Sequence, residues 1–542
     1  MPAPEGAFAG VAENEREESV PVPAHVGASE GTALKLRKIV AGGGTTTSAS
    51  TTSMPPAGDG DVPPLPDLGV LRSKQFLVNE MARCMHFFAP TRCCDCSSDL
   101  GGYYHFFAED GTVYDKDTRV LVTQARFIFS YAVAHEHLES YSFKPDAADY
   151  SKYGSAVDSS PVHAPAGSAT DRFNFMNAVQ HGVKFLSEGP LRNKENGAYY
   201  WVVKLPSKDD KEAGSDDRVE VLEKKIFTYG LAQCLLAYAA ALRIGVVDAK
   251  FYLEETWNLL EKHMWDGRHG LYAEEADENW KATDYRSESG NLHMVEALIA
   301  AYEATQDMKY LERALKVADN ICNRQAGQTK GLVWEHFDEN WKADLKFNND
   351  SEALKIFRPW GIQPGHQVEW ARFLLTLNYH VEKLDCFPPR KELWLVDKAR
   401  YLFDVAVRNA WDSQYGGLAY SFDLDGSVCN DDKIFWVHCE SAGTCAMLAS
   451  LAEQENGNGK DMNRIESCSG GSGMRPEHYW DIYSRIWEHS WKYFVDHKYG
   501  SWRRRLRRDN VPHFLEKTKK ALCVDPDFHM MGAFAGALLM MK

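Results

Sequence analysis

The sequence repeats one unit six times, and this repetition limits the folds that the chain can adopt. Each unit has a turn with glycine and aromatic residues, a short acidic loop and an apolar helix rich in small residues. The turns of the six units begin at these residues: Asp99, Asn196, Gly270, Gly331, Tyr415 and Tyr499. Such a unit cannot bury both faces of its helices alone, so we expect the units to stack against one another.

Long amphipathic segments separate the units, at residues 249–263, 310–324 and 391–409. Each unit therefore predicts an outer helix, a glycine-aromatic loop or short hairpin, and an inner helix. Six such helix pairs predict an all-α fold, a closed (α/α)6 barrel with short β-hairpin loops at one end. The inner helices would be crowded, which agrees with runs of small residues such as 239–241. An open α-solenoid is the alternative architecture.

The two ends of the chain differ in composition. Residues 1–65 mix Ala, Gly, Pro, Ser, Thr and Glu without apolar periodicity, which predicts a disordered tail. Residues 66–542 are expected to form a single barrel domain. A stretch rich in Gly, Asn and Ser near residues 456–473 predicts a flexible insert. With 44% hydrophobic and 12% aromatic residues, the chain can fill a core of this size.

Charge and hydropathy exclude several classes of protein. The net charge of −16 argues against a general nucleic-acid-binding protein. There is no run of about 18 apolar residues, so we expect no membrane-spanning helix. The N-terminus lacks the pattern of a targeting peptide, and the 12 cysteines include no paired metal-binding motif. These features predict a cytoplasmic protein with reduced thiols, and they leave a homodimer open.

Histidines recur at the starts of the last four inner helices. His293 and His366 are 73 residues apart, and His366 and His438 are 72 apart. His529 follows after 91 residues, and the insert near 456–473 accounts for the longer interval. Three of these histidines are followed closely by a carboxylate, from Glu296, Glu369 or Glu440. Closure of the ring would aim all of these side chains at one funnel.

The most informative stretch runs from Arg358 to Leu375. A Pro-Gly pair ends an irregular segment and an apolar run at helical spacing follows, so a helix is predicted to start near His366. In the first turn the positive end of the helix dipole disfavours protonation, which predicts a neutral imidazole that can accept a proton. Glu369 lies three residues later on the same face, and we expect it to hold the substrate or orient the ring.

This set of residues suits proton transfer at the carbon next to a carbonyl. One histidine would open a sugar ring, and a second would move a proton between C1 and C2, or off and back onto C2, through an enediolate. Arg126, in the first inner helix, and Arg358, before the fourth, are expected to stabilise the negative oxygen that develops.

Three other functions are open at this point. Histidine and glutamate also bind divalent metals, although the HExxH and paired-cysteine signatures are absent. A glycoside hydrolase would use paired acids, whereas the acids here accompany histidines. A non-catalytic sugar-binding or regulatory protein could use the same fold.

The residues from Arg358 to Trp370, Arg-Pro-Trp-Gly-Ile-Gln-Pro-Gly-His-Gln-Val-Glu-Trp, resemble the signature of the N-acylglucosamine 2-epimerase family. The resemblance covers about residues 71–542, and it is greatest to the branch of aldose–ketose isomerases and 2-epimerases that act on mannose and related sugars. It implies the six-hairpin barrel and a free monosaccharide as substrate, either a hexose of the mannose, fructose or glucose type or an N-acylhexosamine. We expect neither a metal nor a cofactor.

The resemblance also implies roles for single residues. His366 in Pro-Gly-His-x-x-Glu and His529 in Asp-Phe-His match the catalytic acid/base pair of the family. Arg126 in Gln-Ala-Arg matches its oxyanion-binding arginine, and His293 in Asn-x-His-x-x-Glu-Ala matches a further substrate-site histidine. Trp436 and His438 fall in a Trp-rich pocket motif. The residues expected to bind substrate are therefore Arg126, His293, Arg358, Glu369, Trp436 and His438.

Overall fold

The computed structural model describes residues 62–97, 100–138, 174–206, 218–348, 358–384, 394–457, 475–513 and 528–541. The tail predicted to be disordered lies outside these ranges up to residue 61. The insert predicted to be flexible lies outside them from residue 458 onward. Both stay predictions.

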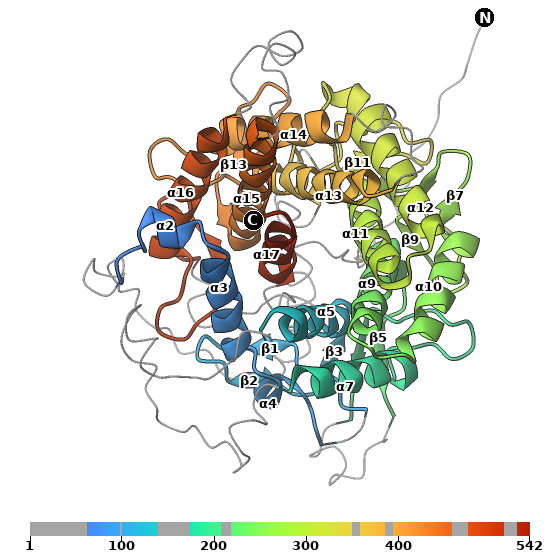
Figure 1. The fold of residues 1–542 in the computed structure, drawn as a ribbon. Helices are drawn as coiled ribbons and strands as arrows, with labels where there is room; N and C mark the ends of the chain where they lie inside the picture. Colours follow the sequence, from blue (N-terminus) through green and yellow to red (C-terminus); the bar gives the residue numbers. More distant parts are fainter. Residues whose placement is uncertain are drawn as a thin grey trace, which may run out of the picture.

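Six helices form an inner ring around the barrel axis (Figure 1). In chain order they are α5 (Leu121–Leu138), α9 (Thr228–Arg243), α11 (Glu288–Thr305), α13 (Pro364–Glu382), α15 (Phe435–Gly457) and α17 (Phe528–Met540). Each packs on the next, and α17 packs on α5, so the ring closes. The predicted (α/α)6 barrel is confirmed, and the open solenoid is wrong.

Six further helices form the outer ring and contact the inner one. They are α3 (Lys74–Phe87), α7 (Phe175–Glu188), α10 (Ala249–His263), α12 (Met308–Asp319), α14 (Trp394–Ala410) and α16 (Pro476–Tyr493). After α12 the chain continues as a π turn and a 3-10 turn, η4 (Asn320–Gln325) and η5 (Ala326–Thr329). Two short helices, α2 (Leu68–Leu71) and α4 (Pro90–Cys93), flank α3.

Burial explains the two helix compositions. Helix α9 buries every residue from Thr228 to Ala241, because it has neighbours on all sides, and most of these side chains are small or apolar, with Gln233 as a buried polar exception. Helix α12 buries one stripe, which includes Tyr310, Leu311 and Ala314, and exposes its charged face. Within the described parts of the chain, no helix is long and apolar enough to cross a membrane.

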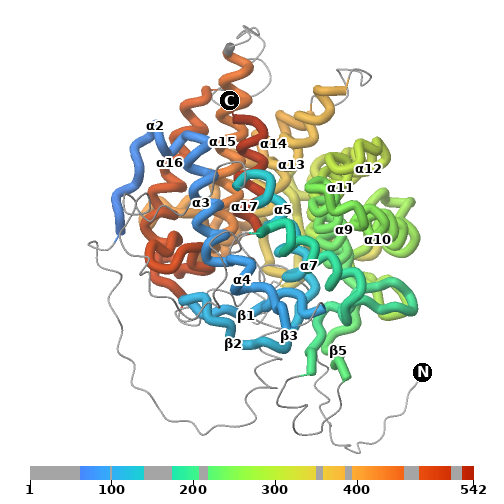
Figure 2. Tube along the Cα trace, turned by 60° about the horizontal axis from the view of Figure 1, so that its bottom comes forward, coloured from blue at the N-terminus to red at the C-terminus, as the bar shows by residue number. Residues whose placement is uncertain are grey.

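Short antiparallel strands join the loops at one end of the barrel, where Figure 2 shows β1, β2, β3 and β5 together. Three pairs are hairpins within one loop: β1 (Phe106–Phe107) with β2 (Val113–Asp115), β7 (Trp265–Asp266) with β8 (Leu271–Tyr272), and β12 (Ser421–Phe422) with β13 (Val428–Asn430). These are the short hairpins that the glycine-aromatic turns predict.

Other strand pairs connect successive units, because the strand before an inner helix pairs with a strand in the loop of the next unit. These pairs are β3 (Thr118–Val120) with β4 (Val202–Lys204), β6 (Ile226–Phe227) with β9 (Glu275–Ala276), β10 (Arg286–Ser287) with β11 (His336–Phe337), and β14 (Lys433–Ile434) with β15 (Arg505–Leu506). Strand β5 (Glu220–Glu223) extends the first pair. The pairings fix the start of each inner helix relative to its neighbour.

Close packing of α15 on α17 gives a test of the ring. A Cβ at Gly443 would lie 2.6 Å from the carbonyl oxygen of Ala533, so Gly443→Ala must push the two helices apart. We expect it to lower the free energy of unfolding by about 1–3 kcal/mol in urea titrations.

The control is Gly536→Ala on α17, where the nearest atom to an added Cβ lies 3.5 Å away. Alanine is favoured over glycine in helices, so this variant should be neutral or more stable by up to about 1 kcal/mol. Equal effects of the two substitutions would contradict the close helix contact.

Candidate active site

His366 lies in the first turn of α13, which begins at Pro364. Its Nδ1 is 2.5 Å from Glu288 Oε1 and 3.3 Å from Glu335 Oε2. Both carboxylates are themselves held, because the Trp370 indole N–H donates to Glu288 at 2.9 Å and the Ser287 hydroxyl donates to Glu335 at 2.6 Å. The imidazole is therefore fixed at one nitrogen by two buried carboxylates.

The charge on His366 differs from the sequence-based prediction. Burial lowers the pKa of His366, but the Glu288 and Glu335 carboxylates outweigh it and raise the pKa well above its usual value. The expected neutral imidazole is therefore wrong, because two carboxylates in contact outweigh one helix dipole. The expectation that Glu369 orients this ring is also wrong, since both Nδ1 partners come from other elements.

His529, at the start of α17, has an equivalent environment. Its Nδ1 lies 3.0 Å from Glu440 Oε1 and 3.4 Å from Glu369 Oε1. Burial lowers the pKa of His529, and the carboxylates of Glu369 and Glu440 in contact with it raise the pKa above its usual value overall. Among the described residues its Nε2 has no hydrogen-bond partner, although the side chain is only 3% exposed. Glu369 therefore forms an ion pair with His529 and not with His366.

Trp436 contacts both imidazoles. Its ring centroid is 5.0 Å from that of His529, in a stacked arrangement, and 5.7 Å from that of His366. The Trp436 ring lies where a Cβ on Gly365 would be, since that atom would come within 2.2 Å of it. The glycine of the Pro-Gly-His motif is thus required by the tryptophan that packs between the two histidine-bearing helices.

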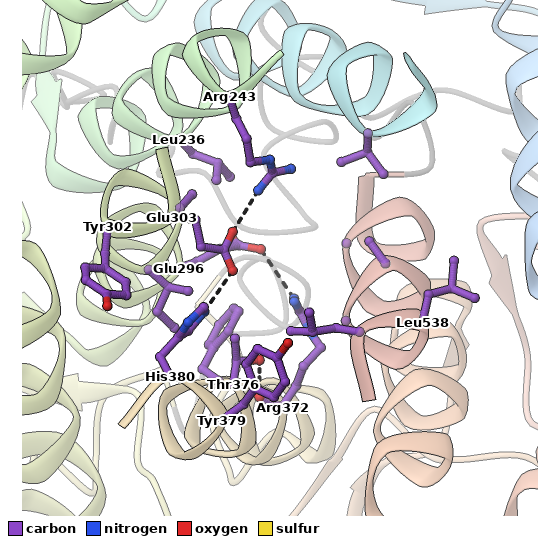
Figure 3. Close-up of a pocket in the computed structure, with 18 of the residues that line it drawn as sticks. Leu236, Arg243, Glu296, Tyr302, Glu303, Arg372, Thr376, Tyr379, His380 and Leu538 are labelled. Atoms are coloured by element: carbon purple, nitrogen blue, oxygen red, sulfur yellow. Dashed lines mark hydrogen bonds and ion pairs between the residues drawn. The ribbon is translucent and has the colours of Figure 1, made fainter. Parts of the chain in front are cut away.

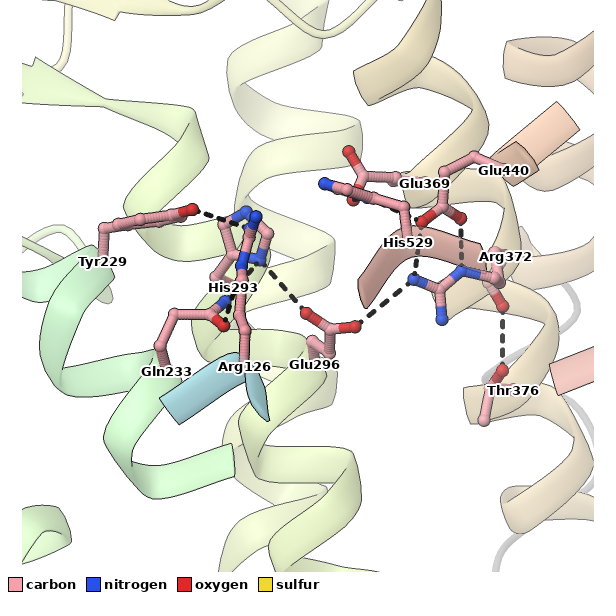
Figure 4. A network of polar contacts seen from close by, with 10 residues as sticks. All are labelled: Arg126, Tyr229, Gln233, His293, Glu296, Glu369, Arg372, Thr376, Glu440 and His529. Atoms are coloured by element: carbon pink, nitrogen blue, oxygen red, sulfur yellow. Dashed lines mark hydrogen bonds and ion pairs between the residues drawn. The ribbon is translucent and has the colours of Figure 1, made fainter. Parts of the chain in front are cut away.

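Arg126 and His293 form a second arm of the site (Figure 4). Arg126 donates to the Tyr229 hydroxyl at 2.7 Å and to the Gln233 side-chain oxygen at 3.3 Å. His293 Nδ1 lies 3.2 Å from Gln233 Nε2 and 3.1 Å from Glu296 Oε2. Burial lowers the pKa of His293 although Glu296 opposes it, whereas the pKa values of His366 and His529 are raised.

Arg372 on α13 connects the two arms (Figure 4). Its guanidinium donates to both oxygens of Glu440, at 2.7 and 3.2 Å, and to Glu296 at 3.3 Å. Sequence reasoning missed Arg372, Glu288 and Glu335. A signal for Arg372 was present, because it is a basic residue three positions after Glu369 on the same face of a predicted inner helix.

Two expected substrate-binding residues have other partners. The His438 Nε2 accepts from the Leu418 backbone N–H and its Nδ1 donates to the Ile434 carbonyl, both at 3.0 Å. Its imidazole stacks on His489, away from the carboxylate cluster. Arg358 forms an ion pair with Glu275 and lies 3.8 Å from the centre of the Tyr285 ring. We therefore assign His438 and Arg358 to the wall of the barrel.

Both histidine–carboxylate groups contain ligands that a divalent metal accepts. Glu288, Glu335 and His366 form one group and Glu369, Glu440 and His529 the other, each with ligand atoms within 4.8 Å of one another. The same oxygens carry the ion pairs that hold the imidazoles. A metal would have to displace the histidine from these contacts.

Comparison with known proteins identifies relatives over most of the chain. The family model for N-acylglucosamine 2-epimerase (GlcNAc 2-epimerase) matches residues 162–533. A D-mannose isomerase from Marinomonas mediterranea is 35% identical over 463 residues, which cover 85% of this chain and 96% of that protein. A D-mannose isomerase from Thermobifida fusca is 30% identical over 60% of this chain and 70% of that protein.

Solved structures give the same fold. A crystal structure of D-mannose isomerase has 34% sequence identity and a TM-score of 0.68, and the match covers 87% of this chain and 99% of that one. The cellobiose 2-epimerase of Bacillus thermoamylovorans has 15% identity and a TM-score of 0.58, over 85% of this chain and 99% of that one. The second likeness concerns the fold alone.

The carboxylates around His366 give a prediction about its protonation. Glu335→Gln removes one of the two charges that raise the pKa of His366, so that pKa should fall. The titration is measured by NMR on protein with ¹⁵N-labelled histidine, and the His366 signal is identified by its loss in His366→Gln. A control is Glu261→Gln, because Glu261 contacts Tyr272 and Arg313 instead. An unchanged His366 titration in Glu335→Gln would contradict the assigned ion pair.

The same shift predicts a pH dependence of stability. The folded-state pKa of His366 is raised, so protonation of this imidazole stabilises the protein most below the unfolded-state pKa of about 6.5, although burial raises the pKa of its partner Glu288 to about 7 and weakens the ion pair on the acid side. This stabilisation is lost as the pH rises through the folded-state pKa.

Proposed function

The chain belongs to the N-acylglucosamine 2-epimerase family, and from this premise we propose that it interconverts a free mannose-type hexose with its ketose or its C2 epimer. The comparisons place the chain among carbohydrate isomerases and epimerases. The choice of mannose is supported by relatives named D-mannose isomerase, one of which is matched over 96% of its length. An N-acylhexosamine would undergo the same chemistry and is an alternative substrate.

The observation that carries the mechanism is the pair of imidazoles, each held at Nδ1 by two buried carboxylates. A carboxylate at Nδ1 fixes the ring orientation and stabilises the imidazolium that forms when Nε2 takes a proton. Such a ring can collect a proton from carbon and return it. We therefore propose His366 and His529 as the catalytic acid/base pair.

The proposed reaction opens the sugar ring and then moves a proton at carbon. One histidine donates its Nε2 proton to the ring oxygen of the sugar and takes the proton of the anomeric hydroxyl in its place, so the ring opens to the aldehyde. The other removes the C2 proton, and the electron pair moves onto the carbonyl oxygen to give an enediolate. Return of a proton to C1, with transfer of the O2 hydroxyl proton to O1, gives the ketose, and return to the opposite face of C2 gives the epimer.

The remaining residues are proposed to bind the sugar. The Arg126 guanidinium carbon lies 4.2 Å from the centre of the Phe528 ring, and Phe528 directly precedes His529 in the sequence. At this position the charge of Arg126 can stabilise the enediolate oxygen. His293 is neutral and can accept or donate a hydrogen bond to a hydroxyl group. Trp436 supplies an apolar face between the two catalytic rings, and Glu369 keeps His529 in place.

Metal independence is part of the proposal. It is supported by the use of the carboxylate oxygens in histidine ion pairs, and by chemistry that needs only protons and a fixed cation. A glycoside hydrolase is less well supported, because the buried carboxylates are paired with histidines rather than set as an acid and a nucleophile.

The proposal is tested by incubating the protein in D2O with mannose, glucose, fructose and N-acylhexosamines, with and without EDTA. NMR should show deuterium entering C1 or C2 of mannose and a second sugar forming, at the same rate with EDTA. If no sugar takes up deuterium, the proposed enzymatic activity is contradicted and a sugar-binding protein is favoured. Loss of exchange in EDTA would overturn metal independence alone.

Variants of the histidines test the acid/base pair. His366→Gln and His529→Gln should each lower kcat by about 10²–10⁴-fold, because each removes one proton carrier. His438→Asn is the control. It should lower the melting temperature, since backbone groups lose their partner, and should leave kcat near that of the wild type. Near-normal kcat in both glutamine variants would show that the pair is wrongly assigned.

A further inference from the structure

Arg372 is a buried cation outside the proposed acid/base pair, and it touches the partners of two histidines. One of its acceptors, Glu440, holds His529, and the other, Glu296, holds His293. Each of these glutamates therefore lies between the guanidinium and an imidazole. This arrangement is drawn in Figure 4 as a continuous chain of dashed lines.

We infer that Arg372 is a positioning residue for the proposed reaction, which keeps Glu440 and Glu296 in the orientations that fix His529 and His293. The inference rests on the proposed function, because the two histidines matter only if they handle the substrate.

The charges in this layer make Arg372 necessary. Glu440 is fully buried, and the neighbouring carboxylates of Glu369 and Glu296 add to the negative charge. Burial raises the pKa of Glu440 even though Arg372 and His529 lower it. Arg372 is the cation here that stays charged at any physiological pH and that bonds two of the carboxylates at once.

The titratable and charged groups of this layer, the Glu440–His529 pair included, come from five elements. They are Arg126 on α5, His293 and Glu296 on α11, Glu369 and Arg372 on α13, Glu440 on α15 and His529 on α17. Removal of Arg372 leaves this set more negative, so the pKa of Glu440 must rise further. A protonated Glu440 no longer stabilises the imidazolium of His529.

A cavity at the opposite end of the barrel reaches Arg372. It has a volume of about 880 Å³ and is lined by the C-terminal halves of α5, α9, α11, α13 and by α17 (Figure 3). Glu296 and Arg372 line the inner end of this cavity and also belong to the layer of the proposed catalytic groups. Leu539, which is 39% exposed, lines the cavity nearer to solvent. A small cation can therefore reach the place of the guanidinium without crossing the sugar site.

The same cavity offers a matched control. Arg243 forms ion pairs with both oxygens of Glu136, at 2.6 and 2.7 Å, and with Glu303, at 2.7 Å. His380 binds Glu303 from the other side, at 2.9 Å. Arg243 thus links glutamates of different inner helices, as Arg372 does. Its ion pairs do not involve His293, His366 or His529.

The test compares Arg372→Ala, Arg372→Lys and Arg243→Ala for conversion of mannose over a range of pH. Arg372→Ala should lower kcat on the order of 100-fold and change KM little, because His529 is misplaced in this variant. Its activity needs an ionised Glu440, so the acidic limb of the pH profile should move to higher pH. Arg372→Lys should lie between it and the wild type, and Arg243→Ala should keep the wild-type kcat and pH profile.

Chemical rescue separates positioning from a merely structural role. Guanidinium chloride at a non-denaturing concentration should restore part of the kcat of Arg372→Ala, and sodium chloride at the same ionic strength should not. Rescue of His529→Ala by guanidinium is not expected. If Arg372→Ala does not fold, Arg372→Lys carries the test through its lower kcat and smaller pH shift.

The outcomes are distinct. A wild-type protein that converts no sugar defeats the proposed function itself. A wild-type protein that converts mannose, together with Arg372 variants that keep its kcat and pH profile, overturns the inference alone. A loss of kcat in Arg372→Ala with no pH shift and no response to guanidinium would also overturn it, since that result is what a general loss of structure produces.

Discussion

Carboxylates that are buried beside imidazoles are the feature on which the rest of the site depends. An isolated buried carboxylate is strongly unfavourable, so each one must have a cationic or hydrogen-bonding partner. Here the partners are the two histidines proposed for catalysis and Arg372. The same pairing that makes burial tolerable also fixes each imidazole at Nδ1, so the proposed proton transfer is assigned to Nε2. Stability and reactivity therefore come from one set of contacts.

The barrel brings these groups together. Inner helices with small residues pack into a closed ring, and Gly443 lets two of them approach closely. Strand pairs between successive units then fix where each inner helix starts. Because every inner helix runs in the same direction, their first turns meet at one end, and residues far apart in sequence become neighbours.

Periodicity and spacing predict the fold and half of the site. The repeats predict the six helix pairs, and the recurring histidines correctly mark the N-terminal ends of the last four inner helices. Partner choice is not predictable in this way. Glu369 shares a helix face with His366, but its Oε1 lies 3.4 Å from Nδ1 of His529 on α17, a contact that only the tertiary fold creates. Glu288 and Glu335 carry no local signal, and His438 has the right spacing but faces backbone groups.

The central claim is that histidines of this barrel move the C2 proton of a sugar. The most direct measurement follows mannose deuterated at C2 during turnover. The account predicts a slower reaction than with unlabelled mannose and release of deuterium to water as product forms, because an imidazole that holds the deuteron can exchange it. Product formation at an unchanged rate, with all of the deuterium still bound to carbon, would contradict it.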